Sequence, residues 1–283
     1  MNEIYDILFY TFFTFTLTFS FKNYLLFPFL NNKINNYEIR NKCIESITEI
    51  INYGGNFIYG IYVLQNRSWL YNSNEWLDDH IHHLNSDDSI KIYYIFYCCR
   101  YISALFLILV EKKKNDFVEM FIHHIATILL VSLSYYTNFI RIGAITMIIF
   151  DFADISLHIA KVFNYLCKNN NKKIYEIASD IFFLIFVISF IYTRNYLFSI
   201  VTYKFSSNIV FNTESNSLMS KVLFLLLITI YILQLYWLNC IFLSVKKKIF
   251  TGKTADVRSD SESDDEDIEF SDMNKFIIKE KED

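Results

Sequence analysis

Turn-forming residues are scarce in this chain of 283 residues, which contains one proline and five glycines. Soluble domains average about 5% proline and about 7% glycine, and both residue types concentrate in turns. In contrast, 53% of the residues are hydrophobic and 19% are aromatic. Several apolar runs approach or exceed the ~20 residues that an α-helix needs to cross a bilayer. The composition therefore excludes an ordinary soluble domain and predicts an all-α fold, a polytopic membrane helix bundle.

Metal-binding and disulfide patterns are also lacking. The five cysteines have no regular spacing, and they are Cys43, Cys98, Cys99, Cys167 and Cys240. The six histidines divide into a loop group and an apolar group, namely His80, His82 and His83 against His123, His124 and His158. A membrane di-iron site needs more histidines on one side, so we expect no metal and no bound cofactor. The 80–83 loop is either simply solvated or an adventitious zinc ligand.

Seven apolar runs are predicted to form transmembrane helices. They are Ile4–Phe21, Ile47–Leu64, Ile90–Val110, Phe117–Tyr135, Ile140–Leu166, Ile174–Tyr192 and Val222–Val245. The first run has no basic flank and no cleavage site, so we interpret it as a retained helix rather than a signal peptide. Residues 193–220 are predicted to be a loop. The chain then divides into an N-terminal helix with a cytosolic linker (1–41), a main membrane domain (42–250) and a tail (251–283).

Basic residues follow the first, third, fifth and seventh runs. These segments contain Lys22, Lys33, Arg40 and Lys42, then Lys112–Lys114, then Lys168, Lys172 and Lys173, then Lys246–Lys248. With seven spans, all four segments lie on one side of the membrane. The positive-inside rule predicts that this side is cytosolic, with the N-terminus lumenal and the C-terminus cytosolic.

The tail is acidic and is expected to be disordered, because it has little apolar surface to bury. Ser259, Ser261 and Ser263 each have an acidic residue three positions further on, a pattern typical of acid-directed kinase substrates. Either these serines are phosphorylated or the segment is simply a solvated acidic tail. The chain shows no sign of a nucleic-acid partner, and the partner that its apolar runs imply is the lipid bilayer.

Ionisable residues are concentrated in the otherwise apolar stretch 116–165. His123 and His124 lie about 9 Å along one predicted helix from its cytosolic end, and Asp154 lies about 18 Å along the next, with Asp151 slightly deeper. Such groups are costly in a membrane and are functional-site candidates by default. Arg100, at a similar depth on the third span, is expected to be a counter-ion to one of the aspartates.

Two interpretations of these groups remain open from the residues alone. A histidine oriented by a carboxylate can transfer protons or accept an acyl group, which indicates proton-transfer or acyl-transfer chemistry. Alternatively, the polar side chains only hold helices together by hydrogen bonds.

The same stretch resembles the TLC-domain family and, within it, the ceramide synthases or longevity-assurance proteins. That signature comprises a basic-Asp-Phe start, HH-x-x-T, R-x-G, HD-x-x-D, A-K and a final tyrosine. The matching residues are Asp116, Phe117, His123, His124, Thr127, Arg141, Gly143, Asp151, Asp154, Leu157, Ala160, Lys161 and Tyr165, and Asp180 and Arg194 also fit. One position departs from the signature, because Phe150 stands where the family usually has histidine.

The resemblance implies N-acylation of a sphingoid base by a fatty acyl-CoA co-substrate, giving ceramide or dihydroceramide in the endoplasmic reticulum membrane. It implies catalytic roles for His123, His124, Asp151 and Asp154, and substrate-binding roles for Thr127, Arg141, Lys161 and Asp180. Lys161 and Lys112–Lys114 are placed to meet CoA phosphates, although the lysine cluster is equally explained by topology. Family members also form homo- or heterodimers, carry a phosphorylated tail, and use the loop before the last span to influence chain length.

Two other functions stay open. Phe150 favours a non-catalytic TLC-domain protein, either translocon-associated or lipid-sensing, whereas the four catalytic candidates argue against it. A lipid transporter is the third alternative, although the chain lacks the internal repeats of many transporters.

Overall fold

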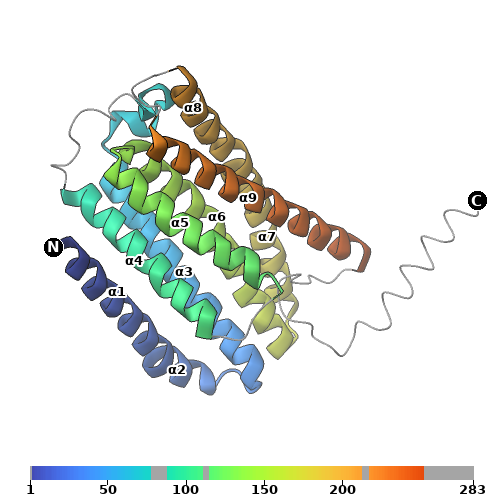
Figure 1. Cartoon of the computed structure of the whole chain (residues 1–283). Helices are drawn as coiled ribbons and strands as arrows, with labels where there is room; N and C mark the ends of the chain where they lie inside the picture. The colour runs from blue at the N-terminus through green and yellow to red at the C-terminus, as the bar shows by residue number, and fades with distance from the viewer. Residues whose placement is uncertain (1, 78–87, 111–114, 212–216, 252–283) are drawn as a thin grey trace, which may run out of the picture.

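The computed structural model describes residues 2–77, 88–110, 115–211 and 217–251. These residues form helices joined by short connections, and no strand occurs among them. The helices are α1 (Asn2–Ser20), η1 (Phe21–Leu26), α2 (Phe27–Asn31), α3 (Tyr37–Leu64), η2 (Ser68–Leu70), η3 (Ser73–Trp76), α4 (Asp88–Val110), α5 (Phe117–Tyr136), α6 (Ile140–Asn170), α7 (Lys173–Phe190), η4 (Ile191–Leu197), α8 (Phe198–Phe211) and α9 (Leu218–Thr251). They lie side by side in one bundle (Figure 1).

The helices confirm the predicted polytopic membrane bundle. Helices occupy all seven predicted spans. Within the described ranges, five helices are long and apolar enough to cross a membrane: 88–110, 117–136, 140–170, 173–209 and 218–250. Many large apolar side chains on their outer faces are exposed, as expected for surfaces that face lipid.

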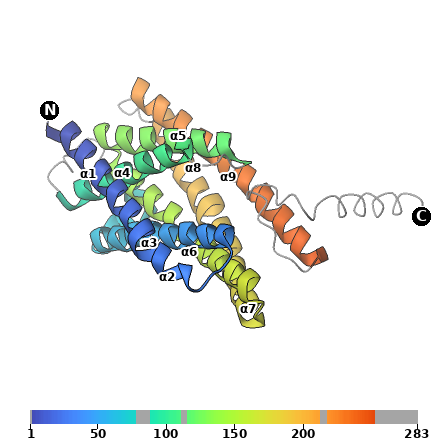
Figure 2. The same ribbon diagram turned by 90° about the horizontal axis from the view of Figure 1, so that it is seen from below.

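The long helix α6 lies at the centre of the bundle. It packs along α3 on one side and along α7 on the other, and α5 packs between α4 and α9. In both views α1 lies against α4 at the edge, and the C-terminal part of α9 extends beyond the other helices (Figures 1 and 2). The consecutive helices α4, α5 and α6 therefore surround a common interior together with α9, which is distant in sequence.

The prediction of a loop over residues 193–220 is wrong for most of its length. Helix α7 continues through the π-helical segment η4 into α8, which ends at Phe211. The reason is burial, since Phe198, Val201 and Phe205 are at most 1% exposed and pack into the main core. Polar residues in this stretch suggested a solvated loop, but the structure places Thr193 and Arg194 inside the bundle.

Two boundaries near the N-terminus also differ from the prediction. Helix α3 begins at Tyr37 rather than Ile47, because the Asn36 side chain accepts hydrogen bonds from the backbone N–H groups of Glu38 and Ile39 and caps the helix. The helix also runs through residue 41, the predicted end of the first domain, and that domain boundary stays a prediction. The segment after the first span is also helical, through η1 and α2, as far as Asn31.

Some predictions fall on residues outside the described part of the chain. These are the lysine cluster 112–114, the histidines at 80, 82 and 83, and the phosphorylation candidates Ser259, Ser261 and Ser263.

Candidate active site

The histidine pair lies on α5, between one and two turns from the start of that helix. His123 and His124 are each only 6% exposed. The Nδ1 atom of His124 lies 2.7 Å from the carbonyl oxygen of Met120. A carbonyl oxygen can only accept a hydrogen bond, so Nδ1 carries the proton and Nε2 of the neutral ring keeps a lone pair. Nδ1 of His123 is buried and has no hydrogen-bond partner among the described residues.

Asp151 on α6 is completely buried and pairs with an arginine. Nη1 of Arg100, on α4, donates to Oδ1 of Asp151 at 3.2 Å. Arg100 also lies 3.9 Å from the Glu49 carboxylate and 3.8 Å from the centre of the Tyr53 ring, both on α3. The expected counter-ion role of Arg100 is confirmed, and its partner is Asp151. Oδ2 of Asp151 has no hydrogen-bond partner in the described structure, so it is available as an acceptor.

Asp154, one turn further along α6, pairs with a second arginine. Nη2 of Arg194 donates to Oδ2 of Asp154 at 2.5 Å and to the carbonyl oxygen of Phe150 at 2.6 Å. Nη1 of Arg194 donates to Oε1 of Gln234, on α9, at 3.4 Å. The sequence did not reveal this contact, because Arg194 fell in the segment predicted to be a loop. The signals for Arg194 were its position directly after an apolar run and its fit to the family signature.

Phe150 fills the position at which the family signature has histidine. Its ring lies nearly parallel to the ring of His123, with centroids 6.4 Å apart, and perpendicular to the ring of Phe198 at 4.8 Å. The side chain is 4% exposed. Phe150 therefore supports His123 by packing and cannot exchange a proton with it.

Aromatic side chains from two other helices complete the surroundings of the histidines. Trp237 of α9 meets His123 edge to face, with ring centroids 5.3 Å apart. Tyr101 of α4 contacts both histidines, at 6.0 Å from His123 and 5.4 Å from His124. Nε1 of Trp237, Nε2 of Gln234 and Oγ1 of Thr127 are buried and have no hydrogen-bond partner among the described residues. Buried polar atoms without partners are rare, so this set is suited to a bound polar group.

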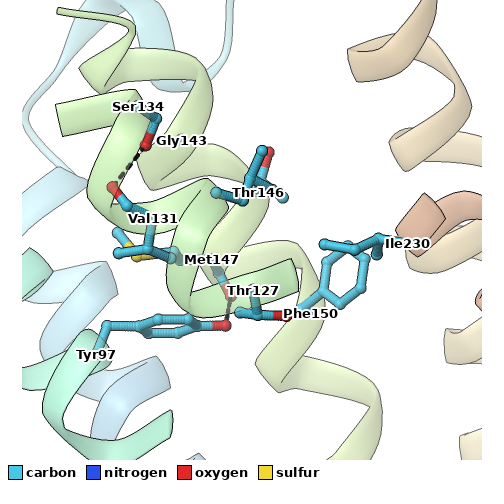
Figure 3. Close-up of a pocket in the computed structure, with 10 residues that line it drawn as sticks. Tyr97, Thr127, Val131, Ser134, Gly143, Thr146, Met147, Phe150 and Ile230 are labelled. Carbon is cyan, nitrogen blue, oxygen red and sulfur yellow. Dashed lines mark hydrogen bonds between the residues drawn. The ribbon is translucent and has the colours of Figure 1, made fainter. Parts of the chain in front are cut away.

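A narrow, mostly apolar cavity begins beside this site (Figure 3). Thr127 and Phe150 line its near end, and Ser134 and Gly143 line its far end. The remaining lining residues come from α4, α5, α6 and α9, and they are Tyr97, Leu130, Val131, Thr146, Met147 and Ile230. The cavity therefore runs along α5 and α6, away from the histidines.

The four predicted substrate-binding residues lie at different distances from the catalytic candidates. Thr127 lies one turn from the histidines and lines the cavity. Arg141, at the opposite end of α6 from the aspartates, donates to the carbonyl oxygen of Glu75 at 2.9 Å. Asp180 on α7 pairs with Lys248 near the end of α9. Lys161 is seven residues beyond Asp154 on α6, about 10 Å along the axis. The structure thus brings only Thr127 of these four directly to the catalytic candidates.

The site also lacks the arrangement of a metal centre. Among the residues that the structure describes, no group of three or more His, Cys, Asp or Glu side chains is placed to hold a metal ion. The reactive groups here are imidazole, carboxylate and guanidinium.

Comparison with known proteins identifies the family of this chain. A family model described as the TLC domain matches residues 42–243, and the chain therefore belongs to the TLC-domain family. Sphingosine N-acyltransferase lac1 of Schizosaccharomyces pombe is 34% identical over 229 residues, covering 76% of this chain and 56% of the yeast protein. Ceramide synthase 4 of Bos taurus is 31% identical over 231 residues, covering 78% of this chain and 54% of the cattle protein. ASC1-like protein 3 of Oryza sativa is 28% identical over 246 residues, covering 83% of this chain and 84% of the rice protein. The chain thus spans little more than half the length of the yeast and cattle relatives.

Proposed function

We propose that this protein is a ceramide synthase, which transfers a fatty acyl group from acyl-CoA to the amine of a sphingoid base. The observation that carries the proposal is the position of His124. Its Nδ1 proton is committed to Met120, so Nε2 is free to act within a buried site that holds two aspartates. The names of the yeast and cattle relatives support the same reaction.

Acyl transfer needs a group that accepts the amine proton. The amine nitrogen attacks the thioester carbonyl carbon, the C–N bond forms, and the C–S bond breaks. A histidine takes the proton from the nitrogen and returns it to the departing CoA thiolate. In a two-step version, one histidine first carries the acyl group and the amine then displaces it. Both versions require an imidazole nitrogen with a free lone pair, as His124 provides.

The aspartates hold the sphingoid base in this proposal. Oδ2 of Asp151 is a buried acceptor without a hydrogen-bond partner among the described residues, and an amine or hydroxyl group of the base can donate to it. Arg100 and Arg194 hold the two aspartate side chains in place by direct pairing.

The oxygen of the thioester becomes negative as the amine attacks. Nε1 of Trp237 and Nε2 of Gln234 are buried donors that find no acceptor within the described part of the chain, and they lie on one face of α9 beside His123 and Arg194. Donors held ready in a buried site stabilise such an oxyanion. We assign this role to Trp237 and Gln234, and we assign the apolar cavity to the acyl chain.

The cellular setting follows from the basic segments and the family. We infer a multi-pass protein of the endoplasmic reticulum membrane, with a lumenal N-terminus and a cytosolic C-terminus. Lys161 lies towards the end of α6 that this orientation places in the cytosol, where it can meet CoA phosphates. We also infer that the protein forms homo- or heterodimers and that Ser259, Ser261 and Ser263 are phosphorylated.

The test is acylation of sphinganine by purified protein with a panel of acyl-CoAs, using wild type, His123→Ala and His124→Ala. Dihydroceramide from the wild type and its loss in both variants is the expected result. Phe150 favours the second candidate, a non-catalytic TLC-domain protein that is translocon-associated or lipid-sensing. Folded wild-type protein that forms no product with any acyl-CoA would overturn the acyltransferase proposal and favour that alternative.

A further inference from the structure

A tyrosine from α4, Tyr94, packs against Gly143 at the far end of the apolar cavity. The hydroxyl of Tyr94 donates to the carbonyl oxygen of Ile140, at the start of α6, with a distance of 2.8 Å. The same hydroxyl lies directly over Gly143, where a methyl group would overlap it and would also approach Oγ of Ser134 to 2.7 Å. Ser134 and Gly143 are the residues that line this end of the cavity (Figure 3). Glycine at 143 is therefore what leaves room for the Tyr94 hydroxyl at this end.

A second hollow lies on the other side of this tyrosine. It is an outer groove between α1, α4 and α5, lined by Ile7, Lys91, Tyr94, Ile95, Cys98, Val131, Ser132, Tyr135 and Tyr136. Val131 lines both the inner cavity and the outer groove. Tyr94 is 4% exposed and Val131 is 6% exposed, so these two side chains form a thin buried partition between the two spaces.

Both ends of the cavity are fixed, so the distance between them limits the length of the acyl chain that the cavity can hold. The reacting carbonyl is held beside His123, at the near end. Ser134 is eleven residues further along α5, about 16 Å at the rise of an α-helix. A chain that is too long for this interval must bend, displace Tyr94 or leave its terminal carbons unburied. Each of these outcomes costs free energy, whereas a chain that fits buries all its methylene groups.

We propose that Tyr94 determines the longest acyl chain that the enzyme accepts. Gly143 leaves room for the Tyr94 hydroxyl, and Tyr94 and Val131 together separate the inner cavity from the outer groove. This inference rests on the proposed acyltransferase function. It places a determinant of chain length on α4, outside the segment 193–220 for which the family resemblance implies that role. Removal of the Tyr94 ring joins the inner cavity to the outer groove and lengthens the space in line with the acyl chain.

The experiment compares product profiles of full-length wild type and variants in competition with an equimolar mixture of acyl-CoAs of increasing length. Tyr94→Ala is expected to raise the ratio of the longest to the shortest product by about tenfold, because each buried methylene group changes discrimination by about tenfold or more in an apolar pocket. Gly143→Ala places a methyl group where the Tyr94 hydroxyl lies, so it is expected to displace the tyrosine and shift the ratio in the same direction. Tyr94→Phe keeps the ring and is expected to keep the wild-type ratio.

Tyr136→Ala is the matched control. It makes the same truncation at a residue that lines only the outer groove and is 69% exposed, so the product ratio should not change. If Tyr94→Ala does not fold, Val131→Ala opens the same partition with a smaller loss of packing. If the wild type is active and neither Tyr94→Ala nor Val131→Ala, whichever folds, changes its chain preference, the inference about Tyr94 is overturned and the proposed function is not. A folded wild type without any product would overturn both the inference and the proposed function.

Discussion

Arg194 and Asp154 are forty residues apart in sequence, and they form a buried ion pair in which Nη2 of Arg194 lies 2.5 Å from Oδ2 of Asp154. The pair joins the π-helical segment η4 to α6, and Gln234 extends it to α9. Three helices are thus fixed around the site by one guanidinium group.

Arg194→Met is expected to destabilise the protein strongly. It leaves the Asp154 carboxylate, whose side chain is only 14% exposed, without its partner. Breaking a buried pair from one side costs about 3–5 kcal/mol. Thermal unfolding in detergent measures the loss. The double variant Arg194→Met with Asp154→Asn removes both charges and should recover much of it, and a double variant as unstable as the single one would contradict the ion-pair explanation.

His124→Asn separates the structural and chemical roles of this histidine. The amide nitrogen of asparagine can reproduce the Nδ1 hydrogen bond to Met120, but it supplies no basic nitrogen. We expect near-normal stability and a decrease of kcat of about 10²–10⁴-fold, the usual contribution of a general base. Steady-state kinetics with sphinganine and acyl-CoA measure it. Retention of more than half the activity would show that His124 has no role in chemistry.

Trp237→Phe tests the oxyanion donor. Phenylalanine keeps an aromatic ring against His123 but removes the N–H group, and loss of one such donor typically lowers kcat by about 10²–10³-fold. The Michaelis constants should change little, because the donor acts mainly in the transition state. A rise in the Michaelis constant for acyl-CoA at unchanged kcat would instead assign Trp237 to ground-state binding.

Phe150→His restores the residue that the family signature usually has. The new imidazole replaces a ring that packs against His123 and Phe198, in a position that is 4% exposed. A buried polar group without a hydrogen-bond partner costs about 1–3 kcal/mol, so we expect a lower unfolding temperature. Chemical or thermal unfolding measures it, with Phe150→Leu as the apolar control. A histidine variant more stable than the leucine variant would show that the site supplies it with a partner.

Two glycines of α3 should respond in opposite ways to alanine. At Gly60 a methyl group would lie 2.7 Å from the Tyr93 hydroxyl, so Gly60→Ala is expected to cost about 1–3 kcal/mol by overpacking. At Gly55 a methyl group would meet no packed neighbour within 4 Å among the described residues, and alanine there should stabilise the helix by up to about 1 kcal/mol. Unfolding midpoints of the two variants give the comparison. Equal shifts would mean that α3 does not approach α4 as closely as the structure shows.

The site was partly predictable because the apolar length that defines a membrane helix is a property of a short, continuous segment of sequence. The apolar runs placed His123, Asp151 and Arg100 at compatible depths, and Arg100 indeed pairs with one of the aspartates. Depth alone could not identify which aspartate, because the direction in which each helix faces depends on its packing. Arg194, Gln234 and Trp237 were not placed in the site, since each is a single polar or aromatic residue in an apolar or presumed loop segment.

The sequence by itself determined the all-α class, the seven helical spans and the ionisable residues to be placed inside the membrane, because apolar length and charge are properties of short segments. The tertiary structure alone decided that residues 193–211 are helical, which arginine pairs with each aspartate, and that the Tyr94 hydroxyl packs against Gly143. These features depend on contacts between helices far apart in the chain, and burial there overrides the local polarity that would otherwise indicate a loop.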